Sequence, residues 1–212
     1  MQQEAPKPKV MDLKSTGTGK AMAFCAPSGA GKTTLVKSLM SSRNDVAFSI
    51  SATNRALRGD EIDGKDYHFL TTEGFRERVE AGEFLEWEEV YPGRFYGTLL
   101  EAVEAIWSSG KHVAFDVDVE GGIRLKELLG DRILTVFVQP PSLEVLAKRL
   151  ENRGTDSPIE IERRLAKADL EMKRANLFDH ILINDDLMTA CGELTKTAEL
   201  FLRPNQDSRP KS

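Results

Sequence analysis

A short glycine-rich segment restricts the possible fold of this chain more than any other feature. Residues Ala26-Pro27-Ser28-Gly29-Ala30-Gly31-Lys32-Thr33 lie between an apolar run and a helical pattern. They match the phosphate-binding P-loop except at the first position, where Ala26 replaces a glycine. In this motif small residues let backbone N–H groups face phosphate oxygens, and the following helix adds partial positive charge.

The motif gives each residue of the loop an expected task. Lys32 is expected to reach the β- and γ-phosphates of a nucleoside triphosphate, and the Thr33 hydroxyl to bind Mg²⁺. The predicted triphosphate-binding set is Ala26, Pro27, Ser28, Gly29, Ala30, Gly31, Lys32, Thr33 and Thr34. The alternative is a turn that only caps a helix, and Ala26 would be strained if its φ were positive.

Apolar runs alternate with helical patterns along the chain. Residues 21–26, 113–117, 133–138 and 181–183 are expected to be buried strands. Helices are expected from Lys32 to about Ser41, and where apolar residues share a helical face: Leu99, Val103, Ile106 and Trp107; Leu143, Leu146 and Leu150; Leu187, Cys191, Leu194 and Phe201. This alternation predicts an α/β fold with a mostly parallel sheet.

Composition excludes several classes of protein. The 212 residues suit one domain, and the net charge of −5 argues against duplex DNA as the main partner. Two cysteines cannot form a disulfide framework, which favours a reducing, cytoplasmic location. The first 20 residues do not resemble a secretory signal, and no apolar run approaches the length of a membrane span. Residues 1–19 and 204–212 are expected to be tails.

Residues 51–98 interrupt the alternation with glycines, charged residues and aromatic residues. They predict an inserted lobe of short antiparallel strands with one helix near 72–81. Arg55 and Arg58 follow a strand directly, with Glu61 and Tyr67 a few residues later. Arginine forks suit a phosphate dianion, and a tyrosine hydroxyl adds a donor. A solvated charged loop is the alternative.

Three carboxylates are candidates for specific tasks. Asp116 and Asp118 end a predicted strand, where a Mg²⁺ contact, direct or through water, is expected; turn aspartates are the alternative. Glu86 lies among apolar residues, and a carboxylate that faces a purine selects guanine, whose N1–H and N2–H₂ are adjacent donors. Ser51 and Thr98 are expected to add hydroxyls. An exposed strand position is the alternative for Glu86.

Eight segments, taken in order, resemble the guanylate kinase family over about residues 20–203. They are Ala26–Thr33, Ser51-Ala52-Thr53-Asn54-Arg55, Asp63-Gly64-Lys65-Asp66-Tyr67, Gly82-Glu83-Phe84-Leu85-Glu86-Trp87, Tyr96-Gly97-Thr98, Asp116-Val117-Asp118, Arg153-Gly154-Thr155 and Ile183-Asn184-Asp185-Asp186. The resemblance implies a P-loop NTPase core with a parallel sheet flanked by helices (20–50, 99–147 and 169–203). It also implies a GMP-binding lobe of short strands (51–98) and a small helical lid (148–168).

The resemblance also implies a reaction, ATP + GMP → ADP + GDP, with dGMP as a second acceptor and Mg²⁺ as cofactor. The implied GMP-binding residues are Ser51, Arg55, Arg58, Glu61, Tyr67, Glu86, Tyr96, Thr98 and Asp118. The implied catalytic residues are Lys32 and the lid arginines Arg149, Arg153 and Arg164, with Asn184 near the ATP base and Thr33 and Asp116 at the metal. A homodimer is among the assemblies that the sequence allows.

The chain departs from the family pattern at several positions. Ala26 replaces the first P-loop glycine, Asn54 stands where threonine is usual, and Glu120 stands where glutamine is common. The turn Tyr91-Pro92-Gly93-Arg94 is longer than usual. Two alternative functions remain at this point: a P-loop kinase for a sugar phosphate, and a non-catalytic guanylate-kinase-like binding module.

Overall fold

The computed structural model describes residues 19–154 and 156–203. The predicted tails, up to residue 18 and from 204 to 212, and Thr155 lie outside the described residues. The core is a five-stranded sheet of β1 (Ala21–Cys25), β2 (Val46–Phe48), β7 (His112–Asp116), β8 (Ile133–Gln139) and β9 (His180–Ile183). The strand order is β2-β7-β1-β8-β9 and every neighbouring pair is parallel, so the predicted parallel sheet is confirmed.

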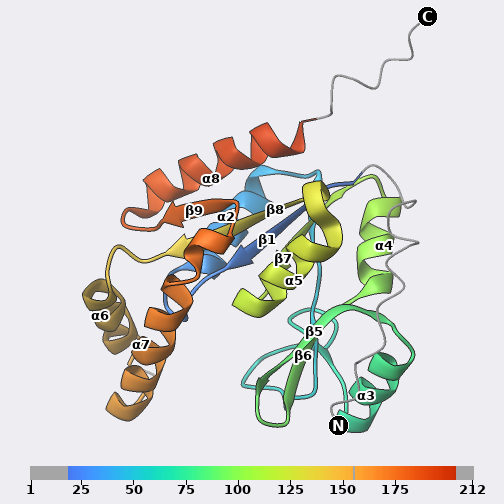
Figure 1. Cartoon of the computed structure of the whole chain (residues 1–212), viewed down its shortest axis with the longest axis horizontal. Coiled ribbons are helices and arrows are strands. Elements are labelled where there is room, and N and C mark those ends of the chain that lie inside the picture. Colours follow the sequence, from blue (N-terminus) through green and yellow to red (C-terminus); the bar gives the residue numbers. More distant parts are fainter. Residues whose placement is uncertain (1–18, 155, 204–212) are drawn as a thin grey trace, which may run out of the picture.

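Helices cover both faces of this sheet (Figure 1). α2 (Lys32–Ser42) and α8 (Leu187–Leu202) pack on one face, whereas α4 (Leu100–Ser108) and α5 (Val119–Leu129) pack on the other. Burial on both faces explains why β1 is an unbroken apolar run with all five residues buried. Two single-turn 3₁₀ helices, η1 (Gly130–Arg132) and η2 (Ala175–Leu177), precede β8 and β9.

The second sheet occupies the inserted segment. Its order is β4-β3-β6-β5, built from β3 (Ala52–Thr53), β4 (His68–Phe69), β5 (Phe84–Tyr91) and β6 (Arg94–Leu99). The short helix expected near 72–81 is α3 (Thr72–Glu80). The β3–β6 and β5–β6 pairs are antiparallel as predicted, but β3 and β4 pair in parallel. The long connection from β3 to β4 lets β4 lie alongside β3 in the same direction, so this part of the prediction was wrong.

Two further helices, α6 (Leu143–Arg153) and α7 (Pro158–Met172), lie beside the carboxyl end of the sheet (Figure 1). Ser142 caps α6, and Ser157 with Glu160 forms a capping box on α7, which has Pro158 in its first turn. Leu146 and Leu150 of α6 pack with Ala168 of α7, so the two helices form a small unit of their own. Within the described residues, no helix is both long enough and apolar enough to cross a bilayer.

The predicted apolar face of α8 needs a correction. Leu194 is buried, and Cys191 and Phe201 are partly buried against the core, as expected, but Leu187 is 42% exposed. The fully buried positions are Ala190, Leu194, Ala198 and Leu202. Alanines allow α8 to lie close to α2, which explains why the contact face follows small residues as well as large ones.

Candidate active site

The P-loop follows β1, and two glycines permit its course. Gly29 and Gly31 both have a φ of 93°, which residues with a side chain rarely adopt. Neither has space for a Cβ atom, which at Gly31 would lie 2.3 Å from Nδ2 of Asn184 and at Gly29 would lie 2.8 Å from Leu150. Within the described ranges no residue other than glycine has a positive φ, so Ala26 is accommodated without strain.

Asn184 braces the loop from the end of β9. Its Nδ2 donates to the carbonyl of Ala30 at 2.7 Å, and its backbone N–H donates to the carbonyl of Gln139 at 2.8 Å. The side chain is 5% exposed, and this contact ties the P-loop to the sheet. The structure therefore places Asn184 against the loop backbone, and its expected role near the ATP base stays a prediction.

Lys32 supplies the positive charge of the loop. Its Nζ forms an ion pair with Asp116 at the end of β7 and donates to the carbonyl of Val117 at 3.0 Å. Burial is the largest influence and on its own would lower the pKa of Lys32, but the charge and hydrogen bond of Asp116, with Cys25 and Tyr67, together outweigh burial and the pKa is raised. Lys32 is therefore a cation at neutral pH, held in place by a carboxylate and a carbonyl.

Oxygen atoms that suit a metal ion line the same cavity as Lys32. Thr33 and Thr34 are exposed in the first turn of α2, and Thr33 lines the same cavity as Asp116. Among the described residues, no group of three or more His, Cys, Asp or Glu side chains could hold a metal. A hydroxyl and a carboxylate fit Mg²⁺, which keeps several waters and binds substrate phosphates as well.

Glu86 is a buried carboxylate on β5. It is 7% exposed and accepts a 2.6 Å hydrogen bond from the Thr98 hydroxyl on β6. Burial raises the pKa of Glu86 to about 7, opposed by the Thr98 hydrogen bond and reinforced by the charge of Asp118. Asp118 caps α5 by accepting from the N–H of Gly121 at 2.8 Å. The predicted alternative of an exposed strand position for Glu86 is therefore wrong.

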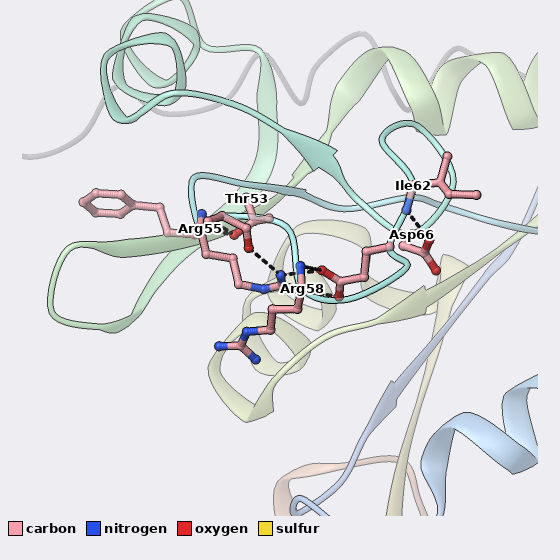
Figure 2. Close-up of polar contacts among 8 residues, drawn as sticks. Thr53, Arg55, Arg58, Ile62 and Asp66 are labelled. Atoms are coloured by element: carbon pink, nitrogen blue, oxygen red, sulfur yellow. Dashed lines mark hydrogen bonds and ion pairs between the residues drawn. The ribbon is translucent and has the colours of Figure 1, made fainter. Parts of the chain in front are cut away.

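The arginines of the lobe form an ordered network with Glu61 (Figure 2). Arg55 donates from both terminal nitrogens to the two carboxylate oxygens of Glu61 at 2.6 Å. The same carboxylate accepts from the backbone N–H of Arg58 at 2.8 Å, and the Arg58 side chain extends away from the network. The Arg55 guanidinium also lies 4.9 Å from the ring centre of Tyr67, whose ring is 6.0 Å from that of Tyr96. The loop is thus held in one shape, not solvated at random.

The three arginines that the sequence assigns to a lid lie on α6 and α7. Arg149 donates to the carbonyl of Asn184 at 2.8 Å, and its other terminal nitrogen is buried without a hydrogen-bond partner. Arg164 donates to the Ser28 hydroxyl in the P-loop and pairs with Asp156 at 3.1 Å. Arg153 lies one turn beyond Arg149 on α6, as the spacing predicts. Arg149 therefore carries a donor that is free for an anion.

These groups line one cavity of about 730 Å³, a size typical of ligand sites. The predicted residues on its wall are Ala26, Pro27, Ser28, Gly29, Gly31, Lys32, Thr33, Thr34, Ser51, Tyr67, Glu86, Tyr96, Asp116, Asp118, Arg149, Arg153 and Arg164. Of the predicted residues, all of which the structure describes, Ala30, Arg55, Arg58, Glu61, Thr98 and Asn184 lie outside this lining. Arg55, Thr98 and Asn184 instead hold lining residues or the loop in place.

The wall also includes residues that the sequence did not single out for this site: Val90, Tyr91, Val117, Lys167 and Glu171. Lys167 and Glu171 lie one and two turns beyond Arg164 on α7, so the helical period from Arg164 could have indicated them. Tyr91 and Val90 come from the β5–β6 hairpin, and no local signal connects them to α7.

Comparisons with known proteins agree on one family. The family model described as guanylate kinase matches residues 18–200. Guanylate kinase of Bacteroides fragilis is 47% identical over 197 residues, which cover 93% of this chain and 97% of that protein. Guanylate kinase of Bacteroides thetaiotaomicron is 51% identical over 185 residues, covering 87% and 91% respectively.

A solved structure shows the same fold. The crystal structure of guanylate kinase from Anaplasma phagocytophilum superposes with a TM-score of 0.72 at 24% identity, covering 90% of this chain and 89% of that one. The family model and the relatives together cover nearly the whole described chain. The chain therefore belongs to the guanylate kinase family, whose members use ATP to phosphorylate GMP to GDP.

Proposed function

We propose that the cavity holds ATP and GMP together and that a GMP phosphate oxygen attacks the γ-phosphorus of ATP in line. The observation that carries this proposal is the shared wall: the P-loop with Lys32 and the buried carboxylate of Glu86 face one cavity. The attacking oxygen is already anionic, so no strong general base is needed. Catalysis then consists of positioning and charge neutralisation.

The P-loop is the proposed ATP side of the site. Backbone N–H groups of residues 28–34 would hold the phosphates at the N-terminus of α2. Lys32 would exchange its ion pair with Asp116 for the more highly charged β- and γ-phosphates. Because Lys32 is already ionised and restrained, this exchange requires no proton transfer and only a small movement of the side chain.

Glu86 is the proposed reader of guanine. Its carboxylate would accept from N1–H and N2–H₂, while the Thr98 hydroxyl holds it in position. Ser51 and Asp118 line the same wall and would complete the base pocket. Adenine presents an acceptor at N1 and lacks a second adjacent donor, so AMP would place a lone pair against the buried carboxylate. The pocket would accept GMP and dGMP alike at the base.

The pH dependence of GMP use follows from the raised pKa of Glu86. Only the ionised carboxylate accepts both guanine donors, so kcat/KM for GMP should fall as pH decreases below about 7. The GMP phosphate also titrates near pH 6, and therefore contributes to the same profile. We expect the Glu86→Gln variant to keep only the phosphate contribution. Identical profiles in steady-state assays of the two proteins would contradict the ionisation of Glu86 as a requirement.

Arg55, Arg58, Tyr67 and Tyr96 are the proposed ligands of the GMP phosphate. Tyr67 and Tyr96 line the cavity, and burial raises the pKa of Tyr67, so its hydroxyl stays protonated as a donor. Arg55 is 9% exposed, and its guanidinium is held in position by Glu61 and by the ring of Tyr67. In this arrangement Glu61 is a positioning residue.

Removing the charge of Glu61 should therefore affect GMP more than ATP. In Glu61→Gln the bidentate pair with Arg55 is lost, and we expect KM for GMP to rise roughly tenfold with KM for ATP unchanged. Asp60→Asn removes the same charge from the exposed neighbouring position and is the matched control. Steady-state titration of each substrate checks this prediction. An equal rise in both KM values would argue against a role at the GMP phosphate.

Helices α6 and α7 carry the proposed lid, residues 148–168, which closes over ATP, and residues 51–98 are the proposed GMP lobe. Arg149, Arg153 and Arg164 would neutralise charge on the transferring phosphoryl group. The free donor of Arg149 and the contact of Arg164 with Ser28 support this role. Closure would exclude water and limit wasteful hydrolysis of ATP.

Mg²⁺ is the proposed metal cofactor, held by the Thr33 hydroxyl and, directly or through water, by Asp116. When bound, it would neutralise negative charge on the β- and γ-phosphates. A homodimer and a cytoplasmic location stay predictions.

A coupled assay of ADP formation tests the whole proposal. ATP and Mg²⁺ would be supplied with GMP, dGMP, AMP, UMP or CMP as separate acceptors. We expect turnover with GMP and dGMP and little with AMP. Equal use of AMP would contradict the base-reading role of Glu86, and turnover with none of the nucleotides would contradict the proposed site.

A further inference from the structure

The β5–β6 hairpin ends in a turn that the proposed mechanism does not use. The turn contains Tyr91, Pro92, Gly93 and Arg94, and it is longer than the family resemblance leads one to expect. The register of the strands shifts between Glu89 and Tyr91, so the tip is an irregular extension of the ladder. Tyr91 is 47% exposed.

Asn54, a second departure from the family pattern, anchors this turn. Its Nδ2 donates to the carbonyl of Gly93 and to the hydroxyl of Thr72, both at 2.9 Å. Its Oδ1 accepts from the N–H of Phe95 at 2.8 Å. Glu89 closes the tip from the other strand by accepting from the N–H of Gly93 at 2.6 Å. The two departures belong together, because the amide of Asn54 holds the longer turn in a fixed position.

The anchored hairpin meets α7 beside the cavity. The Nζ of Lys167 lies 5.3 Å from the ring centre of Tyr91, within the range of a cation–π contact. Glu171, one turn further along α7, pairs with the same Nζ at 3.6 Å and steadies it. Tyr91, Lys167 and Glu171 all line the cavity, so the contact lies at the cavity wall. The two elements approach from opposite sides of this region (Figure 1).

We propose that Tyr91 and Lys167 are positioning residues that join the GMP lobe to the lid when both substrates are bound. The proposal rests on the assignment of 51–98 as the lobe and 148–168 as the lid, since Lys167 lies in the lid and Tyr91 in the lobe. The structure shows this contact formed, so ATP that holds the lid closed would keep Lys167 on the ring of Tyr91. The anchored turn would transmit this restraint to β5, which carries Glu86.

The physical consequence is a coupling between the two substrates. If ATP favours the closed lid, and the closed lid favours the arrangement of the lobe that binds GMP, then each ligand tightens the binding of the other by the same factor. One cation–π contact between half-exposed groups corresponds to about a two- to fivefold change in an equilibrium constant. The contact should therefore contribute up to that much to the coupling, and less to the binding of GMP alone, where ATP does not hold the lid closed.

Titration calorimetry of the full chain separates these effects. GMP would be titrated with and without a non-hydrolysable ATP analogue and Mg²⁺, using wild type, Tyr91→Leu, Lys167→Met and the double variant. Tyr91→Phe and Lys167→Arg are the matched controls, because they keep the aromatic ring and the cation. All replaced side chains are substantially exposed, so the fold should be retained.

We expect the analogue to tighten GMP binding in the wild type, and each disruptive variant to lose about two- to fivefold of that gain. Binding of GMP alone should change less than binding in the presence of the analogue. The double variant should be no worse than either single variant, and the controls should resemble wild type. In each disruptive variant, KM for GMP at saturating ATP should rise by the same factor with little change in kcat.

Three results would overturn the inference: no tightening by the analogue in the wild type, additive losses in the double variant, or a Tyr91→Phe variant as impaired as Tyr91→Leu. The same titrations test the proposed site separately. Failure of the wild type to bind either nucleotide would contradict the site itself, whereas normal binding with additive variants contradicts the contact alone.

Discussion

Replacing Lys32 with alanine is expected to lower kcat by about 10³-fold or more while leaving the fold intact. Removal of one preorganised donor from a site where charge develops costs about 10²–10³-fold in other enzymes, and phosphoryl transfer depends almost entirely on such groups. The Nζ of Lys32 is restrained by Asp116 and Val117 before any ligand binds, so its charge is preorganised.

The fold should survive because Lys32 supports little of the core. Its side chain is 18% exposed, and its partner Asp116 is 30% exposed, so the remaining carboxylate can be hydrated. Lys32→Met tests the charge at nearly constant length, and Lys37→Ala, on the exposed face of the same helix, is the control. The measurements are steady-state turnover and thermal unfolding. Undiminished turnover in Lys32→Ala with a normal melting temperature would refute the P-loop assignment.

The parts of the fold with strong local signals could be predicted from sequence. The strand–loop–helix around Lys32 is fixed by an apolar run, a glycine-rich turn and a helical period, all within 22 residues of one another, and it forms as β1 and α2. Buried strands such as β8 also follow from their apolar composition, because helices cover both faces of the sheet.

Other elements depend on contacts that are distant in sequence. The helix α5 was not predicted, because Gly121 and Gly122 in its first turn have low helix propensity and its order depends on the Asp118 cap. The parallel pairing of β3 with β4 spans a long loop, which no local periodicity reveals. The candidate site likewise depends on contacts between residues that are distant in sequence.

Within the site, residue types predicted chemistry but not contacts. The acidity and apolar neighbours of Glu86 indicated a buried carboxylate, whereas its partner Thr98 comes from pairing of β5 with β6. Lys167 and Tyr91 carry no recognisable motif, and only tertiary structure places them on one wall.

Glu86→Gln should change the acceptor preference of the enzyme. The amide of glutamine places an N–H₂ donor against a guanine donor, so kcat/KM for GMP should fall. Adenine, with an N6–H₂ donor beside the N1 acceptor, complements that amide, so use of AMP should improve or stay level. Each mismatched buried polar group costs about 1–3 kcal/mol, so two such mismatches reduce the preference for GMP over AMP by about 10³-fold.

The control for this variant is Glu80→Gln, which removes the same charge from an exposed position at the end of α3, away from the cavity wall. Competition between GMP and AMP in one reaction vessel measures the preference directly. A preference as strong as that of the wild type would contradict the base-reading role.

Glu86→Gln should make the folded protein more stable while it makes the enzyme poorer with GMP. In the folded protein the pKa of Glu86 is about 7 against an ordinary value of 4.5, so the folded state binds a proton more tightly than the unfolded state. The carboxylate therefore costs no stability below about pH 4.5, and the cost grows as pH rises through 7, reaching roughly 3 kcal/mol at pH 8.

Glu86→Gln should relieve this cost, because glutamine can still accept from Thr98. We expect its melting temperature to exceed that of the wild type by several degrees at pH 8 and by little at pH 5. A variant that is less stable at pH 8 would mean that the buried charge is already compensated in the free protein. The expected combination, higher stability with poorer use of GMP, identifies Glu86 as a group kept for recognition at the expense of stability.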